Sequence, residues 1–192
     1  MGQGVQPSAT RLFACPMTTI TTSQTDQEIL RAISVIDNAI TAPDRGLPKE
    51  LFLLVSRFTP LVNVDLLIRD KRERILLTWR DDEIFGQGWH VPGGCVRIGE
   101  SFGERIAAVA AQELGTKVTF APTPLAVFET VDRTRPARPH HVSLLFDCKL
   151  TSLPDLCSKH TAPPMKPGTW KWHSTCPDDF LQADYRRLFR SS

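Results

Sequence analysis

The sequence lacks three features that would assign it to a specialised class of protein. No apolar run approaches the ~20 residues that a membrane-spanning helix needs. The five cysteines are odd in number and form no C-x2-C pair, so neither a disulfide framework nor a zinc site is expected. The charges almost balance, with 23 basic against 21 acidic residues, which gives no strong field towards nucleic acid or an anionic membrane. These absences predict a cytoplasmic protein that binds neither nucleic acid nor membranes.

The composition is that of a globular protein, with 41% hydrophobic and 23% charged residues in a chain of 192. That length suits one domain with an extension. Residues 1–24 are rich in Thr, Ser, Gln and Gly without sustained periodicity, which predicts a flexible N-terminus. Residues 25–47 are predicted to be a helical extension, and residues 48–192 the main domain.

Helical spacing and cap residues predict two helices before the first strand. From Asp26 to Ile40 the apolar residues recur with helical periodicity, and Ser23 or Thr25 could serve as the N-cap. A second, short helix is predicted to open at Pro48, because proline is tolerated in the first turn of a helix.

Segments rich in Val, Ile and Leu predict a β-sheet in the main domain. Residues 61–68 and 73–80 flank the charged turn RDKRE and are predicted to form a β-hairpin. A further helix is predicted at the C-terminus, over residues 178–189. Strands interrupted by helices are typical of an α/β or α+β sandwich. The remaining predicted strands cover residues 89–91, 95–98, 125–131, 141–150 and 170–174.

The strongest functional signal lies between Gly93 and Gly115. The pair of glycines in PGG allows a ligand to approach the main chain closely. Ser101 and Glu104 then form an S-x-x-E capping box at the start of a helix, and Gly115 follows its last residue.

This segment resembles the Nudix box, whose pattern is G-x5-E-x7-R-E-U-x-E-E-x-G-U with U a bulky aliphatic residue. Gly94, Glu100, Glu113 and Gly115 match the pattern. The resemblance implies a Nudix fold, an α/β/α sandwich around a mixed β-sheet, here with an N-terminal helical extension. The chain departs from the pattern at Ala108, Val109, Gln112 and Thr116.

The departures bear on metal binding. Positions 109, 112 and 113 share one helix face, where most Nudix enzymes carry three carboxylates that gather two or three divalent ions. This chain keeps only Glu113 there, which suits one Mg²⁺ ion, because a hard cation needs anionic oxygens to replace its water.

The resemblance is to one Nudix branch in particular, the GDP-mannose mannosyl hydrolases, and it covers roughly residues 48–190. That branch has T-P-L-V-x-h-D, with h apolar, where this chain has Thr59 to Asp65, and an arginine at the position of Arg80 in LLTWR. Members attack the anomeric carbon of the sugar with water, release GDP and pair as homodimers. The substrate implied here is a nucleotide sugar.

The resemblance also assigns roles to residues. It implies that the Gly93 carbonyl, Glu113 and Glu129 hold the Mg²⁺ ion. It further implies that Arg80 contacts the diphosphate, that Phe52 lies near the base or sugar of its own or the partner's site, and that Asp65 touches the sugar.

Two positions depart from the branch. Cys95 stands where the branch has an arginine that contacts phosphate, and Arg97 could replace it because residues two apart leave a strand on the same face. Thr130 stands where the branch has its histidine general base, and a hydroxyl cannot accept a proton near neutral pH as imidazole can. Candidates for a displaced base are His141, which we take as the working assignment, and His140, His90 and Asp132.

Three functions remain open at this point. The first is hydrolysis of a nucleoside-diphosphate sugar to nucleoside diphosphate and free sugar. The second is pyrophosphohydrolase attack on phosphorus of a nucleotide or dinucleotide, and the third is a non-catalytic nucleotide-sugar-binding domain. Arg133, Arg135 and Arg138 are predicted to form a solvated loop.

Overall fold

The computed structural model describes residues 23–160 and 164–189, and the chain divides into two compact units, residues 1–41 and 42–192. In the first unit, helix α1 (Gln24–Ala39) begins at Ser23, whose hydroxyl accepts the Asp26 N–H at 3.1 Å in a capping box. Ser23 is therefore the N-cap, and Thr25 lies inside the helix. Residues 1–22, most of the predicted flexible N-terminus, lie outside the described residues. The predicted division at residues 24 and 47 stays a prediction.

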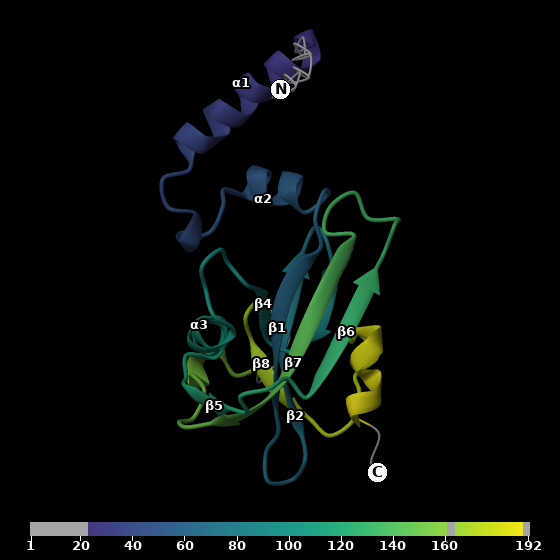
Figure 1. Cartoon of the computed structure of the whole chain (residues 1–192). Helices are drawn as coiled ribbons and strands as arrows, with labels where there is room; N and C mark the ends of the chain where they lie inside the picture. Colours follow the sequence, from purple (N-terminus) through teal and green to yellow (C-terminus); the bar gives the residue numbers. More distant parts are fainter. Residues whose placement is uncertain (1–22, 161–163, 190–192) are drawn as a thin grey trace, which may run out of the picture. The chain divides into compact units, whose positions relative to one another are not determined.

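The second unit contains two β-sheets, which Figure 1 shows with α3 on one flank and the C-terminal helix on the other. One sheet has the order β4-β1-β7-β5, with β6 also paired to β7, and the other has the order β3-β2-β8. Strands β1 and β7 are parallel and the other pairs are antiparallel. The predicted mixed α/β architecture is confirmed. The strands are β1 (Leu61–Ile68), β2 (Ile75–Asp82), β3 (Gly86–His90), β4 (Gly93–Cys95), β5 (Val118–Phe120), β6 (Ala126–Val131), β7 (His140–Leu150) and β8 (Trp170–His173).

The predicted hairpin between β1 and β2 is wrong. The two strands belong to different sheets, and a single bridge between Arg69 and Ile75 joins them beside the turn. The reason is that β1 already has β4 and β7 as neighbours, while β2 has β3 and β8. Both edges of each strand are occupied, so the turn leads the chain from one sheet to the other.

Helix α3 (Phe102–Leu114) has the boundaries that the sequence predicts. Ser101 accepts the Glu104 N–H, the Glu104 carboxylate accepts the Ser101 N–H at 2.8 Å, and Gly115 ends the helix in the left-handed conformation with φ 59. One face, including Ile106, Val109 and Ala110, is buried in a core shared with β1 and β7. This helix carries Glu113 to the edge of that core.

The other helical segments are short. Helix α2 (Lys49–Val55) follows Pro48 and the 3-10 turn η1 (Pro43–Arg45). The 3-10 turn η2 (Leu156–Ser158) precedes β8. The helix predicted at the C-terminus is a 3-10 helix, η3 (Ala183–Phe189), which buries Tyr185 in a second core between the two sheets. Within residues 23–160 and 164–189, no helix combines the length and the apolar character that crossing a membrane requires.

Candidate functional site

A pocket of about 680 Å³ opens in the second unit, among α2, the β1–β4 edge, the end of β2 and the loop between β6 and β7. One carboxylate side chain, Asp65, lines it, against five arginines. Such an excess of guanidinium groups favours an anionic ligand, because each presents a planar fork of donors to phosphate or carboxylate oxygens. The five are Arg80, Arg97, Arg105, Arg135 and Arg138.

Three of these arginines surround one aromatic ring. The guanidinium carbons of Arg80, Arg135 and Arg138 lie 5.0, 4.7 and 4.7 Å from the centroid of Phe85. Arg80 also pairs with Asp82 at 3.3 Å, and Arg135 with Asp132 at 2.9 Å. The negative face of the ring stabilises these neighbouring like charges. Since Arg80 and Arg135 have aspartate partners, Arg138 is the member of the three without a described carboxylate within 4.0 Å.

The prediction of a solvated arginine loop is therefore wrong for two of its three members. Arg135 and Arg138 line the pocket, whereas Arg133 is exposed and does not. Phe85 carried no recognisable sequence signal either. Its role depends on the β6–β7 loop folding over the end of β2, which local sequence does not encode.

Asp65 lies on β1 opposite Gly93 of β4 and is only 4% exposed. Tyr185 donates its hydroxyl hydrogen to Asp65 Oδ2 at 2.6 Å. Burial is the largest influence on the carboxyl group and raises its pKa to about 6, although the Tyr185 hydrogen bond opposes this. A Cβ at position 93 would overlap Asp65 Oδ1, so only glycine fits beside this carboxyl group.

Glu113 reaches Gly93 from α3. Its Oε1 accepts the Gly93 N–H at 3.2 Å, and its Oε2 accepts the Thr78 hydroxyl at 2.8 Å. The residue as a whole is partly exposed, but its carboxyl group is enclosed, and burial raises the pKa to about 7. Glu113 borders a second cavity of about 450 Å³ rather than the large pocket.

A chain of hydrogen bonds links Glu113 to His90. His90 Nε2 lies 3.1 Å from Thr78 Oγ1, and His90 Nδ1 lies 2.8 Å from the Val91 carbonyl oxygen. A carbonyl only accepts, so we assign the ring hydrogen to Nδ1. Burial lowers the pKa of His90 to about 3, which leaves Nε2 as an acceptor. Thr78 has one hydroxyl hydrogen, which it donates to Glu113 when that carboxylate is ionised and can donate to His90 Nε2 when Glu113 is protonated.

The three predicted metal ligands are not brought together. Gly93 and Glu113 are neighbours, but Glu129 is exposed on β6 and lies 3.0 Å from His140 Nε2. Successive strand residues point to opposite faces, so Glu129 faces away from Thr130, which lines the pocket. In the part of the chain that the structure describes, no three His, Cys, Asp or Glu side chains form a group that could hold a metal ion.

The candidates for the general base lie in different environments. His141 lines the pocket, and its Nδ1 is buried with no hydrogen-bond partner among the described residues. Burial, followed by the charge of Arg138, lowers the pKa of His141, so the ring is neutral near pH 7. His140 pairs with Glu129 outside the pocket, and His90 is enclosed in the chain described above. The Thr134 hydroxyl donates a hydrogen bond to Asp132 Oδ1, and this bond lowers the pKa of Asp132.

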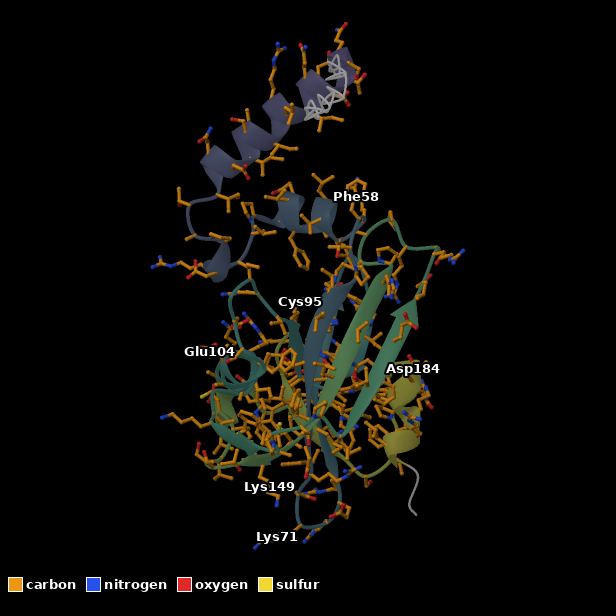
Figure 2. The ribbon with its side chains drawn as sticks, in the orientation of Figure 1. Phe58, Lys71, Cys95, Glu104, Lys149 and Asp184 are labelled. Carbon is orange, nitrogen blue, oxygen red and sulfur yellow. The ribbon has the colours of Figure 1, made fainter. Side chains whose placement is uncertain are left out.

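Thr130 replaces the expected histidine and has a structural contact instead. Its hydroxyl donates to Asp184 Oδ2 at 3.2 Å, and Figure 2 shows Asp184 on the C-terminal helix beside β6. Phe52 lines the pocket of its own chain, and homodimer formation stays a prediction.

Arg105 is a site residue that the sequence analysis missed. Its Nε donates to Glu100 Oε2 at 2.7 Å, and the side chain is buried against the pocket. The Nudix pattern has its arginine at position 108, which is alanine here. Position 105 lies one helical turn earlier on the same face, a spacing that could have revealed it.

The family model described as NUDIX domain matches residues 59–180. The chain belongs to the Nudix family. The matched region of this Nudix chain includes Asp65, Gly93, Glu113 and the arginine-lined wall.

Two Nudix structures share the fold of the chain. They are the MutT protein from Methanosarcina mazei Go1, with 21% identity, a TM-score of 0.52 and coverage of 68% of this chain and 91% of that one, and the MutT NUDIX hydrolase from Burkholderia pseudomallei. The second also has 21% identity and a TM-score of 0.52, with coverage of 68% of this chain and 96% of that one.

One curated relative is similar in sequence. It is the low-salt glycan biosynthesis protein Agl8 from Haloferax volcanii, 35% identical over 82 residues, which cover 43% of this chain and 52% of that protein. The match therefore spans about half the length of this relative.

Asp65→Asn is predicted to stabilise the protein in metal-free buffer at pH 8. Ionisation of Asp65 is disfavoured by burial, so the stability that the neutral form provides is present below pH 3.8 and lost as pH rises through about 6. The shift corresponds to about 3 kcal/mol. Urea unfolding should give similar stability for variant and wild type at pH 4 and a higher free energy of unfolding for the variant at pH 8.

Asp81, exposed on β2, provides the control. Asp81→Asn should change stability by less than about 0.5 kcal/mol at either pH. If Asp65→Asn were destabilising at pH 8, the buried carboxylate would not be a cost to the fold.

Proposed function

We propose that this Nudix hydrolase cleaves a nucleoside-diphosphate sugar, GDP-mannose or GDP-glucose, to nucleoside diphosphate and free sugar. The observation that carries the proposal is the pocket of about 680 Å³ with five arginines in its walls, of which Arg97 and Arg138 have no described carboxylate within 4.0 Å of the guanidinium group. The volume is in the range of about 300–1,000 Å³ common for ligand sites. A diphosphate supplies the negative charge that these walls favour.

The composition of α3 supports attack on carbon rather than phosphorus. Val109 is 3% exposed, and a Cβ at Gly94 would lie 3.1 Å from its Cγ2. Position 109 is therefore part of the core, and Gln112 is neutral. Attack on phosphorus in this family relies on several carboxylates that gather two or three ions. With Glu113 alone on this face, release of an intact diphosphate from the anomeric carbon is the better fit.

The sequence relative points in the same direction. The Haloferax volcanii protein is named for glycan biosynthesis, which supports a substrate that contains a sugar.

The proposal includes one Mg²⁺ ion held by Glu113 and the Gly93 carbonyl, with Asp65 as third oxygen donor in place of Glu129. Asp65 Oδ1 lies against Gly93, and Glu113 Oε1 accepts the Gly93 N–H. Both carboxyl groups are enclosed and neither has a described cationic side chain within 4.0 Å. A bound cation would neutralise negative charge on the leaving diphosphate.

His141 is proposed as the general base, because it lines the pocket with a neutral ring and a free Nδ1. Its lowered pKa keeps the ring ready to accept a proton over most of the physiological pH range.

Incubation with Mg²⁺ and GDP-mannose in water enriched in oxygen-18 tests the reaction. Mass spectrometry should find label in free mannose and none in GDP, because water attacks carbon. EDTA should abolish turnover, and excess Mg²⁺ should restore it. Label in GMP or mannose phosphate would establish attack on phosphorus. Thermal stabilisation by a panel of nucleotide sugars without any turnover would instead indicate a binding domain.

The metal ligands can be tested without turnover by titrating Mn²⁺ and following the free-ion signal in electron paramagnetic resonance. Glu113→Gln should abolish saturable binding, and Asp65→Asn should weaken it about tenfold or more. Glu129→Gln should bind as the wild type does. If Glu129→Gln lost Mn²⁺ binding and Asp65→Asn kept it, Glu129 and not Asp65 would be the third metal ligand.

The two adjacent histidines of β7 give a matched pair for the base. His141→Gln should lower kcat by a factor of about 10²–10⁴, the usual contribution of general base catalysis. His140→Gln should leave kcat within about twofold, since His140 lies outside the pocket. In the wild type, the acid limb of the pH profile should lie below the ordinary imidazole value of 6.5. The opposite ranking of the two variants would remove His141 from this role.

A further inference from the structure

Arg138 brings a positive charge into the pocket without an acidic partner. Arg80 and Arg135 each pair with an aspartate, but no described carboxylate lies within 4.0 Å of Arg138. Its Nε is buried and has no hydrogen-bond partner among the described residues. Burying an unpaired charge is expensive, and the same enclosure lowers the pKa of Arg138. An anion in the pocket would supply the opposite charge that Arg138 lacks.

The backbone at Arg138 is held in an unfavourable conformation. Its φ is 54, in the left-handed region, which a residue with a Cβ rarely adopts. The proline that follows, Pro139, also disfavours helical conformations at this position. The Arg138 N–H donates to Ser56 Oγ at 3.1 Å, and Ser56, 1% exposed, donates its own hydrogen to the Leu53 carbonyl at 2.8 Å. The end of α2 therefore fixes this conformation, and strain kept in this way is common at functional sites.

The side chain of Arg138 is also held by contacts with its neighbours. The guanidinium carbon lies 4.7 Å from the ring centroid of Phe85 and 5.6 Å from that of Phe52. Nη2 lies 3.6 Å from Cys95 Sγ, and the Cys95 thiol in turn donates to Asn63 Oδ1 at 2.8 Å. Figure 2 shows Cys95 near the end of the sheet that lies towards α2. The guanidinium group of Arg138 therefore lies beside Cys95, the residue of β4 that follows Gly94.

This location coincides with a substitution in the sequence. The Nudix branch that the chain resembles has an arginine at position 95, and the structure brings the guanidinium of residue 138 to that cysteine. Arg97, the replacement that the sequence suggests, lies elsewhere on the wall, where a Cβ at Gly46 would be 3.4 Å from Arg97 Nε.

We infer that Arg138 binds a phosphate oxygen of the substrate's diphosphate, in the place of the missing arginine at position 95, and that Ser56, Phe52 and Phe85 position it there. The inference rests on the proposed function for the identity of the anion as a diphosphate. It adds a substrate-binding residue outside the Nudix box and links α2 to phosphate recognition.

Isothermal titration of the full chain with inorganic pyrophosphate at constant ionic strength tests this inference without any turnover. Arg138→Ala should bind pyrophosphate about 10- to 100-fold more weakly, as expected for loss of a charge-assisted hydrogen bond. Arg133→Ala, which removes the same charge from an exposed position of the same loop, should bind within about twofold of the wild type. Arg138→Gly should match Arg138→Ala while keeping the fold, because glycine tolerates a positive φ.

A charge-restoring variant tests the shared location. Adding Cys95→Arg to Arg138→Ala should recover most of the lost affinity, because the new guanidinium enters the space that Arg138 leaves. Wild-type affinity in Arg138→Gly, or an equal loss in Arg133→Ala, would overturn the inference. Failure of Cys95→Arg to rescue would overturn the claim that the two positions serve one phosphate subsite.

The outcome is separable from that of the proposed function. Weak pyrophosphate binding by Arg138→Ala, with no hydrolysis of nucleotide sugars by the wild type, would keep the phosphate subsite and remove the reaction. Hydrolysis of GDP-mannose with an unchanged KM in Arg138→Ala would keep the reaction and remove the subsite.

Discussion

Two enclosed carboxyl groups meet at Gly93, and the arrangement of the domain around them depends on this contact. Asp65 comes from β1 of one sheet, and Glu113 comes from α3. Their supporting hydroxyl groups come from elsewhere, Thr78 from β2 of the other sheet and Tyr185 from the C-terminal helix. Since Asp65 occupies the space of a Cβ at position 93, the β1–β4 register and the glycine require each other.

These acids are unfavourable for the free protein, because burial raises both pKa values, to about 6 for Asp65 and about 7 for Glu113. The wall above them has the opposite imbalance, with several guanidinium groups around Phe85. Among the described residues no salt bridge joins Asp65 or Glu113 to an arginine. Arg80 and Arg135 pair with Asp82 and Asp132 instead, so the uncompensated charge around Phe85 is that of Arg138. A cation beside Gly93 and an anionic substrate beside Arg138 would each supply the missing opposite charge, and ionisable groups with shifted pKa values are common at functional sites.

The sequence predicts the parts of this protein that depend on local signals. The boundaries of α3 follow from the Ser101–Glu104 capping box and from Gly115, all within one segment. The predicted β1–β2 hairpin is wrong because the partners of β1 are β4 and β7. Strand β7 lies about eighty residues away in sequence, and no local signal predicts that pairing. The location of Arg138 in the pocket cannot be predicted from the sequence for a similar reason. Its position depends on a positive φ at a residue that is not glycine and on a hydroxyl from α2.

The Nudix box of this chain keeps the capped helix α3 and its glycines, but some charged residues of the usual pattern are absent from it. Other residues of the chain carry charge near the same place. Arg105 pairs with Glu100 from one turn earlier than the usual arginine, so the entry to α3 remains tied to the loop before it. Val109 packs against Gly94 and is 3% exposed, so position 109 is part of the core. With position 109 apolar, the second acid of the proposed metal site would come from another element, and Asp65 on β1 lies against the neighbouring glycine, Gly93. Residues outside the usual motif positions, Arg105 and Asp65, therefore lie near the places of the missing charged residues. The motif sequence alone does not reveal these charged groups.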